Sequence, residues 1–246
     1  MDSGYYAACA GLRARSQALD LIASNLANAQ TTGYRSGSTT FQSLLAAHTP
    51  PSTLPALNRA VNDFGVLGNS VVDQSAGSME HTGGQLDLAL EGKGFFEVQT
   101  GSGVLYTRNG GFQISAKGQL ITANGSPVLG DQGRPLQVPS GNVTIAADGT
   151  VSVNGLNAGR IRVLEFPAGT ALKAEGNSYY SAPAGKAQAA KESSVRQGML
   201  ESSNVNPVTA AVELISVQRE AEMLQRALSL FNTEFQRIAA QDLPRV

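Results

Sequence analysis

Few residues of this chain have side chains suited to catalysis or metal binding. The 246 residues include two histidines, His48 and His81, and one cysteine, Cys9. Neither histidine has a carboxylate or cysteine arranged around it, as a general base or a metal ligand would require. Cys9 lies among alanines, which is typical of a small buried helical residue. These residues predict no metal site and no disulfide framework.

One stretch, LEGKGFF (90–96), superficially resembles a phosphate-binding loop because it contains Gly92-Lys93-Gly94. It lacks the spacing of a true phosphate loop and the helix that should follow, so a strand entry or a bulge is the better interpretation. The signatures of serine hydrolases, zinc proteases and dinucleotide-binding folds are also missing from the sequence. We therefore expect no catalytic residues and no cofactor, and the protein is predicted not to be an enzyme.

The composition restricts the possible partners. Eighteen lysines and arginines balance 19 acids, for a net charge of −1, which argues against nucleic acid or an anionic membrane surface. No apolar run reaches the ~18 residues that a membrane span needs. The N-terminal MDSGYYAACAGLRARS lacks the basic and apolar regions of a cleaved signal peptide. Charged residues make up only 15%, against about 25% in ordinary domains, so we expect much of the surface to be covered by partners.

The residues at the start of the chain, 1–34, predict an amphipathic helix. Its apolar residues recur at steps of three and four, which is the pattern of a coiled-coil seam, and only Arg15 interrupts them. Ser3 can cap the beginning, and Gly33 can stop the helix in a left-handed conformation. The apolar series comprises Tyr5, Ala8, Leu12, Leu19, Ile22, Leu26 and Ala29.

A second and longer helix is predicted over 206–243. Asn206 and Pro207 form a favourable start, and Pro244 ends it. Neither terminal helix has much else to pack on, so we expect the two to pair as a coiled coil. Such a pair leaves most of the surface of each helix exposed to solvent, which indicates partners outside the chain. The expected seam and subunit interface comprises Leu12, Leu19, Ile22, Leu26, Leu214, Val217, Leu224, Leu228, Phe231 and Phe235.

Between the helices, residues 84–182 predict a compact antiparallel β domain of sandwich or barrel type. VTIAADGTVSVNG (143–155) reads as a hairpin that turns at Asp148-Gly149, with Val143 and Ile145 facing Val151 and Val153. FQISAKGQLI (112–121) reads as a second hairpin that turns at Lys117-Gly118. Further strands are expected at 94–99, 104–107, 128–129 and 159–166. The fold class is therefore α+β and mainly β.

Two segments rich in Ser, Thr, Gly, Pro and Ala, 35–83 and 183–205, are expected to be connectors, with HTPPSTLPAL (48–57) the plainest example. The aromatic residues of the β domain fall at strand positions and are expected in its core. Tyr179-Tyr180 could alternatively form a surface on which a carbohydrate stacks.

The segment SNLANAQTTGY (24–34) is an unusual end for a helix. Its Asn and Thr residues are mediocre helix formers, and no charged residue occurs between Leu21 and Tyr34. A frayed end in solvent would explain the weak helix formers but not the missing charge. Asn and Thr can donate and accept hydrogen bonds in contacts with several neighbours without the cost of desolvating a charge. We therefore favour a helix end covered by other subunits.

Three motifs in order resemble those of the bacterial flagellar rod and hook proteins. SNLANAQTTGY is similar to their N-terminal signature, the stretch 86–130 to their shared central region, and GMLESSNVNPVTAAVELISVQREAEMLQRAL (198–228) to their C-terminal signature. Together they cover most of the chain. The motif residues are Asn25, Leu26, Ala27, Asn28, Thr32, Gly33, Tyr34, Ser203, Asn204 and Val205.

The resemblance implies a structural role. Such subunits are exported by the flagellar type III apparatus without a cleaved signal, and they join copies of themselves and other rod subunits in a helical tube that transmits torque. Their terminal helices form the inner coiled-coil tube, and the location is the basal body in the periplasmic space. The short length and the proline in SNVNPV look most like the proximal-rod member, with the distal-rod and hook subunits as alternatives. A secreted glycan-binding or adhesive β module is the competing class.

Overall fold

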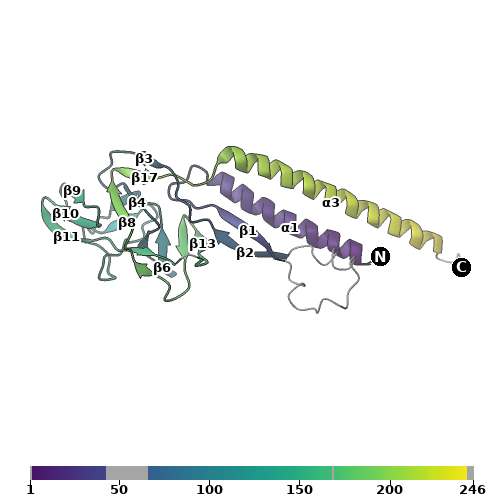
Figure 1. Cartoon of the computed structure of the whole chain (residues 1–246), viewed down its shortest axis with the longest axis horizontal. Coiled ribbons are helices and arrows are strands. Elements are labelled where there is room, and N and C mark those ends of the chain that lie inside the picture. Colours follow the sequence, from purple (N-terminus) through teal and green to yellow (C-terminus); the bar gives the residue numbers. More distant parts are fainter. Residues whose placement is uncertain (1, 43–65, 168, 243–246) are drawn as a thin grey trace. The chain divides into compact units, whose positions relative to one another are not determined.

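The structure is a computed structural model that describes residues 2–42, 66–167 and 169–242 (Figure 1). The expected connector HTPPSTLPAL, together with His48, lies outside these residues. The chain divides into two compact units. We call Met1–Leu26, Ser38–Ser70 and Pro207–Val246 the helical unit, and Ala27–Gly37 with Val71–Asn206 the β unit. The chain thus passes from one unit to the other at the end of the first helix and again at the start of the last.

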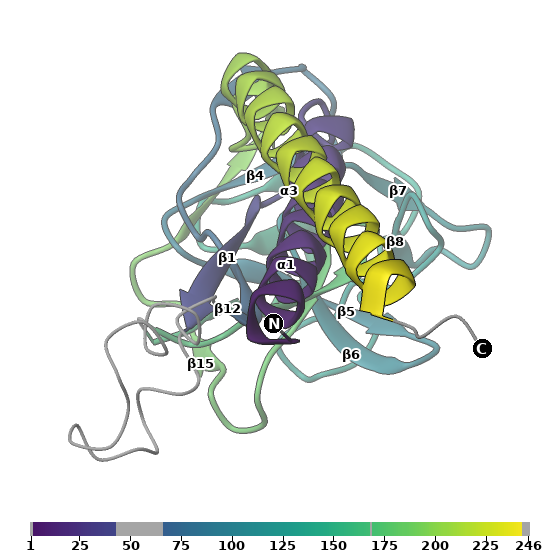
Figure 2. The ribbon, with the colours of Figure 1, turned by 90° about the vertical axis from the view of Figure 1, so that its right-hand side faces the viewer.

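The helical unit contains the two terminal helices, α1 (Asp2–Ala27) and α3 (Pro207–Asp242). They lie side by side in both views (Figures 1 and 2), and Arg15 Nε forms an ion pair with Glu220 Oε2 at 3.0 Å. Strands β1 (Gly37–Gln42) and β2 (Val66–Val72) pair with each other.

The residues of the expected seam on α3 differ in burial. Ala210 and Ala221 are buried, and Leu214, Val217, Leu224 and Leu228 are half-buried, whereas Phe231 is 53% exposed. The side chain of Phe235 lies outside the described residues.

On α1 the leucines and the isoleucine of the predicted series are less buried than small residues, of which Ala8 alone belongs to that series. Leu12, Leu19, Ile22 and Leu26 are half-buried, and the buried residues are Ala8, Gly11, Ala14 and Ala18. Small side chains let a neighbouring backbone come close, which periodicity in large apolar residues does not reveal.

The β unit consists of short strands in several antiparallel sheets. The largest has six strands in the order β13-β14-β6-β5-β12-β15 and is open, with β13 and β15 at its edges, so among the described residues the expected barrel does not close. The strands are β3 (Met79–His81), β4 (Leu88–Glu91), β5 (Phe95–Thr100), β6 (Gly103–Thr107), β7 (Phe112–Ile114), β8 (Leu120–Thr122), β9 (Val143–Ile145), β10 (Thr150–Val153), β11 (Leu156–Arg160), β12 (Val163–Glu165), β13 (Lys173–Gly176), β14 (Tyr179–Ser181), β15 (Gln188–Ala189), β16 (Ser194–Gln197) and β17 (Met199–Glu201).

Both predicted hairpins are confirmed. Val143 pairs with Val153 and Ile145 with Val151, so their buried side chains lie on one face. Strand β7 pairs with β8, and Gly118 in the turn between them has a φ of 74°. The strand expected over 159–166 is instead divided between β11 and β12.

The segments expected to be connectors contain strands that pair with distant parts of the chain. Strand β16 pairs with β4, and β17 pairs with β3. These strands are short, and their partners lie more than a hundred positions away, so local patterns did not reveal them. Residues 194–201 are therefore part of the β unit, and they position the short segment that leads into α3.

The core of the β unit contains the aromatic residues as expected. Phe95 packs edge-on against Phe166 and Tyr180, with ring centroids 5.6 and 5.8 Å apart. Tyr179 and Tyr180 are both buried, and the hydroxyl of Tyr179 is 2.7 Å from Thr122 Oγ1. A carbohydrate cannot stack on rings that are already covered, so the alternative proposed for this pair is wrong.

Candidate functional site

The segments that flank the two terminal helices meet in the β unit. Residues 33–36 follow α1, and residues 201–204 precede α3. The Gly33 N–H donates to the carbonyl of Glu201 at 2.7 Å, and the Asn204 N–H donates to the carbonyl of Tyr34 at 3.3 Å. The Ser36 N–H donates to Asn204 Oδ1 at 2.7 Å. Gly33 of the N-terminal motif is thereby joined to Glu201, and Tyr34 to Asn204 of the C-terminal motif.

A third segment, 73–78, completes this junction. Asn204 Nδ2 donates to the carbonyl of Ser75 at 3.1 Å and to that of Asp73 at 3.3 Å. The Asp73 N–H donates to the carbonyl of Ser36, and the Ser202 N–H donates to the carbonyl of Ser78, both at 2.8 Å. The Asn204 side chain therefore bridges all three segments, because its oxygen accepts from one segment while its nitrogen donates to another.

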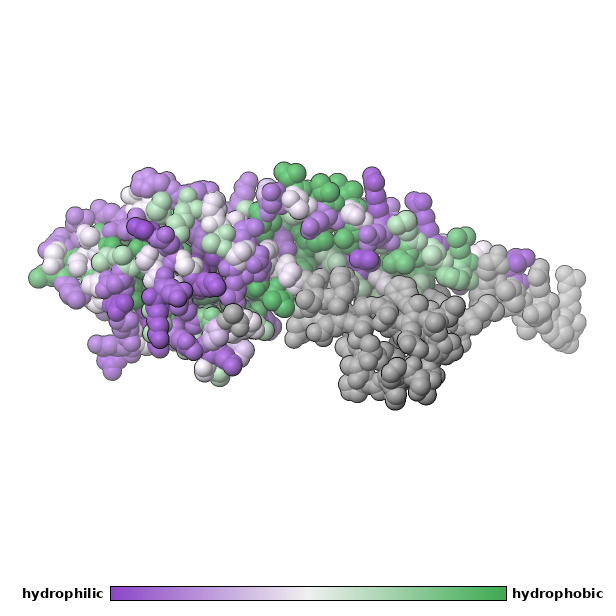
Figure 3. Space-filling model, viewed as in Figure 1, coloured by the Kyte–Doolittle hydropathy of each residue, from purple (hydrophilic) through white to green (hydrophobic). Residues whose placement is uncertain are grey.

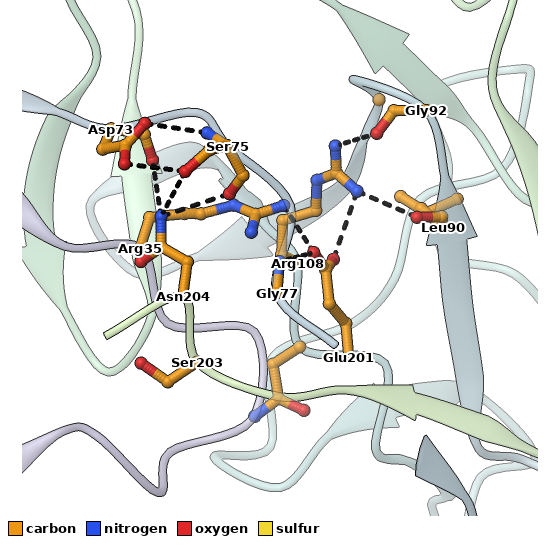
Figure 4. Close-up of polar contacts among 12 residues, drawn as sticks. Arg35, Asp73, Ser75, Gly77, Leu90, Gly92, Arg108, Glu201, Ser203 and Asn204 are labelled. Atoms are coloured by element: carbon orange, nitrogen blue, oxygen red, sulfur yellow. Dashed lines mark hydrogen bonds and ion pairs between the residues drawn. The ribbon is translucent and has the colours of Figure 1, made fainter. Parts of the chain in front are cut away.

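A carboxylate lies buried at the centre of the junction (Figure 4). Glu201 Oε1 is 2.6 Å from Arg35 Nη2, and Oε2 is 3.2 Å from Arg108 Nη1. The Gly77 N–H also donates to Oε1 at 2.9 Å. All three charged side chains are at most 1% exposed. We call Arg35, Arg108 and Glu201 the buried charge cluster. Burial of three charges is costly unless they pair, so the two arginines and the glutamate must be buried together.

Arg108 is held from several directions. Its Nη1 donates to the carbonyl of Leu90 at 3.0 Å and its Nη2 to that of Gly92 at 2.5 Å, while the guanidinium carbon lies 5.0 Å from the centre of the Phe95 ring. Burial lowers the pKa of Arg108 to about 10, and the Glu201 carboxylate opposes that shift. The side chain is therefore protonated at neutral pH.

Arg35 is held by far less. Its backbone N–H donates to the hydroxyl of Tyr180 at 2.7 Å, and burial raises the pKa of that phenol to about 12. Its three side-chain nitrogens are buried, and none has a hydrogen-bond partner of good geometry among the described residues. The charge contact with Glu201 is thus the principal interaction of the guanidinium. Two cations share one anion, which leaves the cluster with an excess positive charge.

Two glycines let the backbones of the junction touch. Gly33 has a φ of 67°, and a Cβ there would lie 2.3 Å from the backbone nitrogen of Asn109. A Cβ on Gly77 would lie 1.9 Å from the carbonyl oxygen of Ser202. Only glycine fits either place. The left-handed conformation predicted for Gly33 is confirmed, although α1 ends earlier, at Ala27.

The remaining motif residues lie around the end of α1 and the start of α3. Asn25, Leu26 and Ala27 form the last turn of α1. Thr31 donates from its N–H to the carbonyl of Asn28 and from its hydroxyl to Asn28 Oδ1. Further along, Ser203 Oγ accepts from the Val205 N–H, and Thr32 is half-buried.

No metal or membrane site is evident in the part of the chain that the structure describes. His81 is exposed in β3, and Cys9 is a half-buried free thiol. No three residues of the metal-ligating types gather there. None of the described helices combines the length and apolarity needed to cross a membrane.

The sequence patterns did not reveal the buried charge cluster. Its members are far apart in the chain and belong to no catalytic pattern. Arg35 is, however, the first charged residue after the uncharged stretch that ends at Tyr34, and Glu201 lies within the C-terminal motif 198–228. One charge directly after the N-terminal motif and one within the C-terminal motif are the signal that could have indicated the pair.

Three family models match the chain in the order of its motifs. The model described as flagella basal body rod protein matches residues 6–35, the flagellar hook protein FlgE/F/G D1 domain matches 89–153, and the flagellar basal body rod FlgEFG protein C-terminal model matches 196–240. A flagellar basal-body rod protein FlgF from Caulobacter vibrioides is 34% identical, with all of both chains covered. The chain belongs to the flagellar basal-body rod proteins.

Other relatives agree with this assignment. The flagellar basal-body rod protein FlgF of Salmonella typhimurium is 36% identical over 93% of this chain and 94% of its own length. FlgG of Bacillus subtilis is 29% identical over 87% of this chain and 89% of its own length. The rod proteins are structural subunits, so the sequence prediction of a protein that is not an enzyme is confirmed by family membership. The matched N- and C-terminal models end and begin around the junction described above.

Proposed function

We propose that the chain is a structural axial subunit of the flagellar basal-body rod, of the proximal type. Support for this member comes from the relatives named FlgF, which are 30–36% identical, against 27–30% for those named FlgG. The distal-rod and hook subunits remain the alternatives within the family.

The observation that carries a polymeric role is a second apolar face on α3. At about 100° per residue, Val212, Ile215, Met223 and Leu230 fall on one side of the helix, roughly opposite the buried Ala210 and Ala221. Their exposed fractions are 63, 52, 61 and 67%. Apolar surface is visible along this helix in Figure 3. A helix that is apolar on two opposite sides needs a partner on each side.

The partner that fits the second face is a helix of another rod subunit. The same face carries Arg219 and Arg226, so the partner must also offer hydrogen-bond acceptors. A contact between different faces of successive copies does not close on itself, and repeated contacts of this kind build a helical filament. In this proposal the coiled-coil seam residues of α1 and α3 lie inside the filament, and the uncharged SNLANAQTTGY segment contacts neighbouring subunits.

Membership of the family also supports the remaining parts of the proposal. The subunit reaches the periplasmic part of the basal body through the flagellar type III apparatus, with that apparatus and the other rod subunits as its partners. Once incorporated, it transmits torque. The β unit presents contacts toward the outside of the tube.

Complementation of a motile bacterium that lacks its proximal-rod gene tests this function. The wild-type chain should restore swimming, and Ile215→Asp should not, because it places a charge on the second apolar face. The matched control is Gln225→Asp, which adds the same charge at an exposed position away from that face. Circular dichroism of both purified variants verifies that the helices form. Normal swimming with Ile215→Asp would contradict the role of this face, and failure of the wild-type chain would contradict the function.

A further inference from the structure

The two arginines of the buried charge cluster are not equivalent. Arg108 has Glu201, two backbone carbonyls and the Phe95 ring as partners. Arg35 has Glu201, and its Nε and Nη1 have no hydrogen-bond partner among the described residues. If Arg35 were absent, Glu201 and Arg108 would remain as a balanced pair of one anion and one cation.

Arg35 therefore does not act as an ordinary stabilising residue. A buried guanidinium with unsatisfied donors is costly, and replacing such a charge by an apolar side chain is often neutral or stabilising. The excess charge would disappear, and the Glu201–Arg108 contact would persist. Arg35 is therefore not expected to add to the stability of the β unit.

The contacts of Arg35 indicate a different role. Its neighbour Gly33 donates to the Glu201 carbonyl, while Arg35 itself contacts the Glu201 carboxylate. These two contacts are made by residues two positions apart, so they fix which residue of 33–36 lies opposite Glu201. A slip by one position would place Tyr34 or Ser36 at the carboxylate, and neither side chain carries a positive charge to pair with it.

We infer that Arg35 is a positioning residue. It fixes the segment that follows α1 against the segment that precedes α3, at some cost to the stability of the β unit. The two places where the chain passes from the β unit into the helices are thereby held at one spacing in every copy. The importance of that spacing for a filament rests on the proposed function, whereas the positioning itself does not.

The test is amide hydrogen exchange on the full-length protein and its Arg35→Met variant. The amides of β5 and β6 report opening of the whole β unit, and those of residues 33, 35 and 36 report the junction. In the variant we expect exchange in β5 and β6 to be unchanged or slower, while exchange at the junction amides becomes at least about tenfold faster. Arg35→Lys should restore part of the protection, because it retains the charge.

Arg196→Met is the matched control. Arg196 also pairs with a glutamate, at 2.8 Å, but both partners are 55% exposed, so we expect no change at the junction. Unchanged exchange of residues 33–36 in Arg35→Met would overturn the inference, and so would equal acceleration in β5 and β6, which would make Arg35 a stabilising residue.

Swimming of the same variants separates this inference from the proposed function. Impaired swimming with Arg35→Met, together with loosened junction amides and a stable β unit, supports both. If the wild-type chain fails to restore swimming, the proposed function falls and the exchange result still decides the positioning role. If swimming is lost while the junction amides are unchanged, the positioning role is overturned and the rod function stands.

Discussion

Removal of the shared carboxylate is the most severe single change that the junction allows. Glu201→Gln keeps the shape of the side chain and can still accept the hydrogen bond from Gly77, but it leaves Arg35 and Arg108 without a counterion. Breaking a buried ion pair by removing one partner costs about 3–5 kcal/mol, and this one change leaves two buried cations without a counterion. We expect a loss of at least about 4 kcal/mol, a large fraction of the roughly 5–15 kcal/mol that stabilises a typical domain.

Amide exchange in the centre of the β unit measures this loss without interference from the helical unit. A loss of about 4 kcal/mol corresponds to roughly a thousandfold faster exchange at the most protected amides of β5 and β6. The matched control is Glu91→Gln, which removes a carboxylate from the exposed pair with Arg196 and should leave these amides unchanged.

A small effect would show that the two arginines do not need Glu201. If Glu201→Gln accelerates exchange by less than about tenfold, the two arginines do not depend on the carboxylate, and the junction is held by its backbone contacts alone. The double variant Arg35→Met with Glu201→Gln provides a further check, because it leaves one buried cation without a counterion instead of two. It should be more stable than Glu201→Gln by itself.

The other expectations concern a glycine, a buried acid and the helical seam. Gly33→Ala should weaken docking of the segment 33–36 by about 1–3 kcal/mol, measured by amide exchange, because φ is 67° and the new Cβ would meet the backbone of Asn109; unchanged protection would contradict this. Burial raises the pKa of Glu97 above 4.5, so its contribution to stability is present at low pH and is lost as the pH rises past 4.5. In urea titrations, the Glu97→Gln variant should therefore lose less stability than the wild type as the pH rises above 4.5, and it should be no less stable than the wild type at pH 7. A less stable variant at pH 7 would show that the contact between Glu97 and Arg162 outweighs the cost of burial. Leu224→Asp would place an unpaired charge in the seam and should abolish incorporation into rods, and Asn25→Asp should impair polymerisation while the monomer still folds. The amount of each variant in isolated basal bodies measures both effects. A normal amount of Leu224→Asp would argue against the seam, and a normal amount of Asn25→Asp would argue against coverage of the end of α1 by other subunits.

Local patterns predicted the elements whose determinants lie close together in the chain. The hairpin from Val143 to Val153 was predicted down to its facing residues because alternation and the Asp148-Gly149 turn occur within eleven positions. The terminal helices were predicted because their apolar periodicity is long. On both helices the buried residues are small, and small residues give little periodic signal. They are Ala210 and Ala221 on α3 and Ala8, Gly11, Ala14 and Ala18 on α1.

What the sequence could not reveal depends on contacts between distant residues. Strand β16 is recognisable only through its pairing with β4, and β17 through its pairing with β3. The junction is a stronger example, since Ser36 and Asn204 are 168 positions apart. The family motifs placed Tyr34 and Asn204 among important residues, but nothing in either motif indicated that they are hydrogen-bonded to each other.

The roles of Arg35, Arg108 and Glu201 were even less accessible from the sequence. Charged residues are usually exposed, so three charges distributed over the chain are expected on the surface. Their burial follows from the approach of three backbones, which in turn depends on glycines at positions 33 and 77. Such a cluster can be recognised only after the fold has brought the segments together.

Mass spectrometry of purified basal bodies would show whether this chain is a subunit of the flagellar rod. Basal bodies would be isolated from the complemented deletion strain, and peptides of this chain would be quantified against those of the other rod proteins. We expect the chain to be retained in a fixed proportion to them after membranes and soluble proteins have been removed. Absence of its peptides from basal bodies of swimming cells would show that the chain is not a rod subunit.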